Sequence, residues 1–212
     1  MNGIIQELTG LLKTKNIGTD SDRALLLDFQ ATLETKPEKA IKLEKDALAQ
    51  IENITADNAR LVSNLHANLG GLYRMNGHPD LAREHMEKSI SLLDQFNLLH
   101  INDSIPQIAN YAMFLTEQQE PERGISELQK LSGIIKEYHS DDCLDYAKVQ
   151  ETLGTIYLMT VNLPQAKTHF KRAFKIYEKI WADEPEMIKA KYQEIQELYP
   201  QIGFCIGKNL SG

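Results

Sequence analysis

Residues 66–82 read HANLGGLYRMNGHPDLA, and this stretch decides the fold. Large apolar residues recur at spacings of three and four before and within it, which is the pattern of one buried helix face: Leu61, Leu65, Leu69, Leu72 and Tyr73. The pattern stops at Gly77, which can close a helix in the left-handed conformation. Pro79 then suits the first turn of a new helix, where its missing N–H is no loss. The stretch therefore predicts two helices joined by a tight turn.

The spacing of the prolines shows that this helix pair is repeated. Pro37, Pro79 and Pro121 are 42 residues apart, and Pro164 comes one residue later than the same step requires. Small residues keep the 42-residue register in two series: Ala40, Ala82, Gly124 and Ala166, and Gly70, Ala112 and Gly154. The first copy departs from the second series, because it has Asp28 there. We predict four repeats, at 21–62, 63–104, 105–146 and 147–188.

The predicted packing follows from these small residues. Gly70 and Gly154 let the two helices of one pair approach closely, and long side chains fill the space beside them: Tyr73, Tyr157, Met86 and Phe170. One pair cannot bury both of its faces, so we expect an all-α, right-handed superhelix of stacked pairs. Its ends need covers, which we predict as an N-terminal capping helix within 1–20 and a C-terminal capping helix and tail at 189–212. That second cap is expected to begin at Pro185.

Composition excludes several classes of partner. Among 212 residues, 30 are acidic and 23 are basic, which gives a net charge of −7 and opposes binding to nucleic acid or to an anionic membrane. The longest apolar run is far shorter than the roughly 20 residues of a membrane-spanning helix. The first residues do not resemble a signal peptide, so Cys143 and Cys205 are expected as free thiols in the cytoplasm.

The sequence shows no arrangement of catalytic side chains. Phosphate loops, nucleophile elbows and zinc motifs are missing, so we expect no enzyme activity, no cofactor and no metal. In the segment His139 to Cys143 we expect a loop in which Ser140, Asp141 or Asp142 caps the next helix. His85 and His169 are expected on the surfaces of the second helices. The basic residues between Lys167 and Lys179 are interpreted as a solvated outer face.

Two copies carry most of a known repeat signature. The second reads His66-x2-Leu69-Gly70-x2-Tyr73 and then Ala82-x3-Met86; the fourth reads Gln150-x2-Leu153-Gly154-x2-Tyr157 and then Ala166-x3-Phe170. This resembles the tetratricopeptide repeat (TPR), whose pattern is W-x2-L-G-x2-Y followed by A-x3-F. The 42-residue period is similar to the long repeats of kinesin light chains and bacterial peptide receptors. The resemblance covers about residues 21–188 and implies the superhelical fold.

The resemblance also implies where a ligand binds. First helices of TPR pairs line a concave groove, which places these residues in it: Asn64, Asn68, Arg74, Asn110, Met113, Glu117, Lys148, Glu151, Thr152 and Thr155. In long-repeat relatives, asparagines at the position of Asn68 and Asn110 hold a peptide backbone. The alternative is that these asparagines bond a neighbouring helix. Chaperone-tail binders have a lysine where this chain has Ala67 and Ala109, so an acidic C-terminus is not the expected ligand.

These observations predict a non-enzymatic interaction module that binds a peptide or a partner protein in its groove. Two alternatives stay open. The chain could be a regulatory peptide receptor without an output domain of its own, because only about 20 residues precede the repeats. It could also be a scaffold or homodimer subunit that uses the apolar segment 202–206. The sequence leaves the oligomeric state undetermined.

Overall fold

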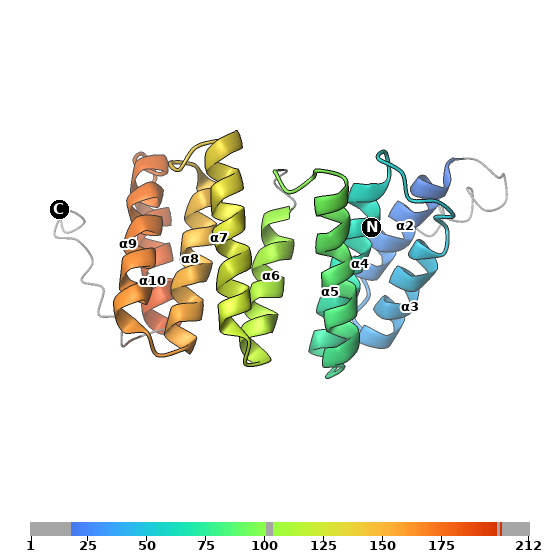
Figure 1. Cartoon of the computed structure of the whole chain (residues 1–212), viewed down its shortest axis with the longest axis horizontal. Helices are drawn as coiled ribbons and strands as arrows, with labels where there is room; N and C mark the ends of the chain where they lie inside the picture. Colours follow the sequence, from blue (N-terminus) through green and yellow to red (C-terminus); the bar gives the residue numbers. More distant parts are fainter. Residues whose placement is uncertain (1–17, 101–103, 199, 201–212) are drawn as a thin grey trace. The chain divides into compact units, whose positions relative to one another are not determined.

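The computed structural model describes residues 18–100, 104–198 and 200, which form helices, turns and connecting loops with no β-strand among them (Figure 1). The helices are α2 (Asp20–Thr32), α3 (Pro37–Leu48), α4 (Ala59–Met75), α5 (Pro79–Gln95), α6 (Ser104–Glu117), α7 (Pro121–Tyr138), α8 (Leu144–Met159), α9 (Leu163–Ile180) and α10 (Pro185–Leu198). The all-α class is therefore confirmed. The predicted helix at the N-terminus and the apolar segment 202–206 lie outside the described residues.

The chain divides into two compact units, residues 1–111 and 112–212, and the division falls within α6. In the first unit α2 packs on α3, α3 on α4 and α4 on α5. In the second unit α7 packs on α8, α8 on α9 and α9 on α10. The repeat bounds 21–62, 63–104, 105–146 and 147–188 stay a prediction.

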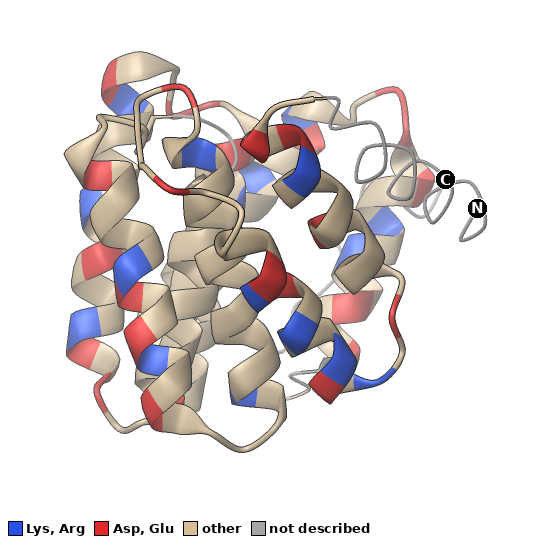
Figure 2. Cartoon of the chain, turned by 90° about the vertical axis from the view of Figure 1, so that its right-hand side faces the viewer, with Lys and Arg blue, Asp and Glu red and all other residues tan. Residues whose placement is uncertain are grey.

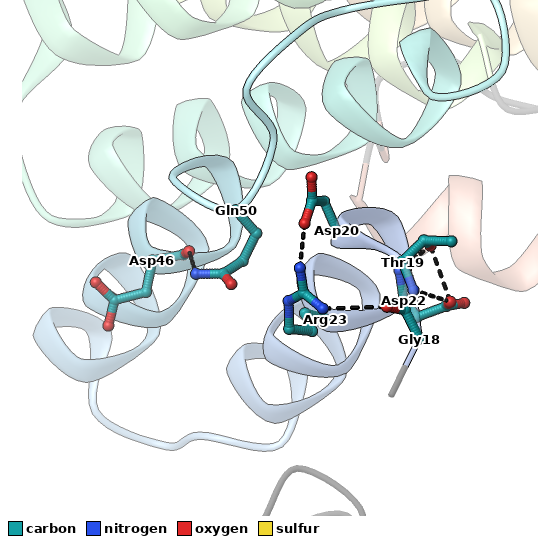
Figure 3. A network of polar contacts seen from close by, with 7 residues as sticks. All are labelled: Gly18, Thr19, Asp20, Asp22, Arg23, Asp46 and Gln50. Carbon is teal, nitrogen blue, oxygen red and sulfur yellow. Dashed lines mark hydrogen bonds and ion pairs between the residues drawn. The ribbon is translucent and has the colours of Figure 1, made fainter. Parts of the chain in front are cut away.

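Prolines and polar caps fix where helices begin. Pro37, Pro79, Pro121 and Pro185 each open a helix, and α9 opens at Leu163 with proline in its first turn. The one-residue delay of Pro164 thus leaves the helix start in place. At α2, the side chain of Thr19 accepts from the N–H of Asp22 at 3.2 Å, and the Asp22 carboxylate accepts from the N–H of Thr19 at 2.7 Å (Figure 3). This reciprocal capping box satisfies two N–H groups that the helix leaves free.

The turns inside three of the pairs share one backbone conformation. Gly77, Gln119 and Val161 have positive φ angles of 75°, 64° and 60°, and they are 42 residues apart. In each turn the following N–H bonds a carbonyl five residues back, at 2.9, 2.8 and 2.7 Å. This left-handed closure was predicted at Gly77 only. Glutamine and valine hide the same turn from a sequence search for glycine, and the β-branched Val161 adopts this conformation with strain.

Close helix contacts occur at the small residues that the sequence singled out. A Cβ atom on Gly70 would lie 2.5 Å from Cγ of Met86, and one on Gly154 would lie 2.9 Å from the ring of Phe170. On Gly124 it would lie 2.6 Å from the carbonyl oxygen of Ala112. Met86, Phe170 and Ala112 are at most 4% exposed. The predicted role of these glycines in helix approach is therefore confirmed.

The helix surfaces carry charges of both signs. Figure 2 shows acidic and basic residues interspersed along the helices. The basic side chains of α9 are exposed, which confirms the interpretation of 167–179 as a solvated face. Within the described ranges, every helix is too short or too polar to cross a membrane.

Candidate functional site: a polar cleft in the first unit

A cleft of about 290 Å³ lies in the first unit. Its walls come from the first helices of successive pairs, α2, α4 and α6, and its lining consists of Asp28, Asn64, Ala67, Asn68, Pro106, Gln107 and Asn110. Three of the predicted groove residues, Asn64, Asn68 and Asn110, therefore line one cleft. The volume is at the lower end of the roughly 300–1,000 Å³ typical of ligand pockets. It suits a single side chain with its neighbouring backbone.

A buried hydrogen-bond network orients Asn64. Gln107, 9% exposed, donates through Nε2 to the side-chain oxygen of Asn64 at 2.5 Å. Its own oxygen accepts from the hydroxyls of Ser63 at 2.8 Å and Ser89 at 2.6 Å. The network ties α4, α5 and α6 together, and a satisfied buried network of this kind holds its members in one geometry. Because the oxygen of the Asn64 amide faces Gln107, its NH₂ group faces the other way.

Asn68 has the opposite orientation. Its NH₂ group donates to Oδ1 of Asp28 at 2.9 Å and to Oε1 of Glu44 at 3.1 Å. The alternative that asparagines bond neighbouring helices is thus realised at Asn68, which links α4 to α2 and α3. Its side-chain oxygen faces away from the two acids. Asn64 and Asn68, one helical turn apart, therefore differ in which end of the amide is engaged within the protein.

The two acids stand where other pairs have an apolar contact. Asp28 is 42 residues before Gly70, and Glu44 is 42 residues before Met86. Gly70 and Met86 touch, and so do Gly154 and Phe170 at the same positions of the fourth copy. In the first pair, a carboxyl pair replaces this contact. Glu44 is only 2% exposed, whereas Asp28 is half-buried and lines the cleft.

Burial keeps one proton on this pair. Desolvation is the largest cause that raises the pKa of Glu44 to about 8, and the neighbouring Asp28 adds to it. Desolvation also raises the pKa of Asp28, while hydrogen bonds from Glu44 and Asn68 lower it. Near pH 7 Glu44 is therefore mostly the neutral acid that shares its proton with the Asp28 carboxylate. Asp28 and Glu44 escaped the sequence analysis, although Asp28 broke the series of small residues and so gave a signal.

The other predicted groove residues do not line this cleft. In the first unit, Arg74 lies half-buried in the last turn of α4. In the second unit, Met113 is half-buried and Glu117 is exposed on α6. On α8, the hydroxyls of Thr152 and Thr155 donate to backbone carbonyls one turn earlier, at 3.0 and 3.1 Å.

Two charged groove candidates on α8 are engaged in ion pairs or hydrogen bonds. Lys148 is exposed and lies 3.8 Å from the carboxylate of Asp145. Glu151 accepts from the hydroxyl of Tyr177 at 2.6 Å and pairs with Lys191 at 2.8 Å. Glu151 thus connects α8 with α9 and α10, and this contact helps to hold the C-terminal helix in place.

Two smaller predictions are wrong. The cap of α8 is Cys143, whose Sγ accepts from the N–H of Tyr146 at 3.4 Å, while Ser140 accepts from the N–H of Asp142 instead. His169 is buried rather than on the surface, because its Nδ1 bonds Oε1 of Gln150 at 2.9 Å. In the described part of the chain, no three side chains of metal-ligand type gather around one point.

Comparisons with known proteins agree with the repeat pattern. Residues 104–179 match the sequence model of the Tetratricopeptide repeat. No curated protein matches the sequence. BtubC (BKLC) from P. vanneervenii has a similar crystal structure, with a TM-score of 0.67 and 19% identity over 82% of this chain and 70% of that one.

Two crystal forms of kinesin-light-chain-like, nearly identical TPR-like repeats from Podosopora anserina are also similar. Both are 15% identical to this chain, with TM-scores of 0.67 and 0.64. They cover 85% and 84% of this chain and 90% of their own. At such identities the likeness shows the fold. The predicted resemblance to the tetratricopeptide repeat family is therefore confirmed, by the sequence over residues 104–179 and by the fold over most of the chain.

Proposed function

We propose that this chain is a non-enzymatic interaction module that binds an extended peptide segment of a partner in the cleft between α2, α4 and α6. The observation that carries the proposal is the meeting of Asn64, Asn68 and Asn110 at one cleft. Side-chain amides bond the N–H and C=O groups of a peptide backbone whatever its side chains are. TPR-like folds generally serve protein–protein interaction, which supports the same conclusion.

The orientation of the amides supports an extended ligand. Asn64 turns its NH₂ group away from Gln107, so it suits a ligand carbonyl. Asn68 turns its oxygen away from the two acids, so it suits a ligand N–H. Donor and acceptor are fixed by buried partners before the ligand arrives, which reduces the entropy lost on binding.

A selection from a library of random displayed peptides tests the proposal. We expect the wild type to enrich peptides that lose binding to the Asn64→Ala, Asn110→Ala double variant. The matched control is Gln95→Ala, which removes an exposed amide at the end of α5, outside the cleft lining. Thermal unfolding monitored by circular dichroism verifies that each variant is folded. Peptides that bind the double variant as well as the wild type would contradict the assignment of the cleft.

A further inference from the structure

The starting observation is the exchange of an apolar contact for two acids. The second and fourth copies place a glycine against Met86 or Phe170, and the first copy places Asp28 against Glu44 at the same two positions. Burying such a pair is unfavourable compared with apolar residues of similar volume. Both positions changed together, and the changed pair borders the cleft through Asp28. The location suggests a role in binding.

The pair has no cation of its own. Asn68, a neutral amide, is its hydrogen-bond donor, and the groups that shift the pKa values of Asp28 and Glu44 include no lysine or arginine. The cleft lining contains no basic residue either. Oε2 of Glu44 is buried and receives no donor from the described residues. A carboxylate that is half-buried, faces a cleft and lacks a counter-ion attracts a cation strongly, because water screens it poorly.

We propose that the cleft recognises a positively charged group of its peptide, an ammonium or a guanidinium, which pairs with Asp28 while Asn64 and Asn110 bind the adjacent backbone. This inference rests on the proposed function and adds the class of ligand to it. Asn68 and Glu44 hold the Asp28 carboxylate in position. A ligand acid at the same place would meet a like charge, and an apolar side chain would desolvate Asp28 without replacing the lost hydrogen bonds.

The test uses the same displayed library on three proteins. The wild type is expected to enrich lysine or arginine at one peptide position. Asp28→Asn keeps the shape and removes the charge, so the enrichment should vanish. The Asp28→Gly, Glu44→Met double variant restores the contact that Gly70 and Met86 make, so it removes both acids in a form that the fold already accommodates. It should also lose the enrichment, which keeps the test valid if Asp28→Asn folds poorly.

Synthetic copies of one enriched peptide identify the source of the charge. Replacing its lysine by norleucine, or acetylating its N-terminus, removes one ammonium at a time. The change that matters should weaken binding about tenfold to the wild type, the factor expected for a charge-assisted hydrogen bond. It should have little effect on binding to Asp28→Asn.

The outcomes separate the two proposals. Enriched peptides without a basic residue or a required N-terminal ammonium, still dependent on Asn64 and Asn110, would overturn the charge preference and leave the peptide-binding function standing. An absence of any enrichment over the Asn64→Ala, Asn110→Ala variant would overturn both.

Discussion

Nδ1 of His66 lies 2.9 Å from Nδ1 of His85, so one neutral ring must donate to the other. Burial is the main cause that lowers the pKa of His66 to about 4, and it lowers the pKa of His85 as well. Exactly two repeat lengths later, Gln150 and His169 form the equivalent bond with an amide in place of the first ring. The chain thus contains both a pH-sensitive and a less sensitive version of one contact.

We predict that His66→Gln makes the protein more tolerant of acid. An unfolded histidine binds a proton near pH 6.5, whereas folded His66 does so only near pH 4, so the unfolded state holds more protons between these values. The stability that the neutral ring contributes is present above pH 6.5 and is lost as the pH falls toward 4. The wild type should lose up to about 1.4 kcal/mol per pH unit from this group, and the variant should not. Urea unfolding at pH 7.5 and pH 5 measures the difference. Equal losses in both proteins would show that the pair does not control acid stability.

The carboxyl pair predicts a trend of the opposite sign. Glu44 keeps its proton to about pH 8 when folded and releases it near pH 4.5 when unfolded, so the folded state holds more protons between these values. Its contribution to the free energy of unfolding is therefore largest at low pH and declines as the pH rises toward 8.

Glu44→Gln tests this trend, because glutamine imitates the neutral acid at every pH. We expect the variant to be more stable than the wild type at pH 8 and to approach it at pH 5, as measured by urea unfolding. Glu38→Gln, at an exposed site near the start of α3, is the matched control and should leave the pH profile unchanged. A variant that is less stable than wild type at pH 8 would contradict a buried neutral Glu44.

The left-handed turns predict a stabilising glycine. Val161 has a φ of 60° and is 80% exposed, so its side chain adds strain and buries little surface. Val161→Gly should raise the free energy of unfolding by about 1 kcal/mol, since the left-handed conformation costs a residue with a Cβ roughly 1–2 kcal/mol. The reverse change, Gly77→Val, should lower it in the second pair. Chemical denaturation of both variants would refute the strain at Val161 if they moved in the same direction.

Two glycines of α7 should respond in opposite directions to alanine. A Cβ on Gly124 would lie 2.6 Å from the backbone oxygen of Ala112, so Gly124→Ala should destabilise by about 1–3 kcal/mol. Gly133 is exposed with nothing within 4 Å of the added carbon, so Gly133→Ala should stabilise by about 0.5–1 kcal/mol through helix propensity. Thermal unfolding of the two variants compares them within one helix. A Gly124→Ala protein as stable as Gly133→Ala would mean that the helices can separate at no cost.

Much of the fold was predictable because repetition multiplies weak signals. A single Pro79 is ambiguous, but prolines at a constant 42-residue interval indicate a helix start in each repeat. The same register located the close approach at Gly70 and Gly154. The turns at Gln119 and Val161 were missed, because neither residue favours a left-handed conformation and the surrounding helix ends impose it.

The site was predicted less completely. Asn64, Asn68 and Asn110 lie on first helices, so helical phase was enough to select them. Glu44 was missed because an acid in an otherwise apolar position reads as an exposed residue of a degenerate repeat. Gln107 was missed because its partners, Ser63 and Ser89, are distant in the sequence.

The sequence by itself determined the helix pairs, their period and the helices that carry the asparagines, because these depend on local propensity and on spacing along the chain. Only the tertiary structure decided which end of each asparagine amide is engaged, and that Asp28 and Glu44 form a buried pair sharing one proton. Those properties depend on distances between helices and on exclusion of water, which no local pattern specifies.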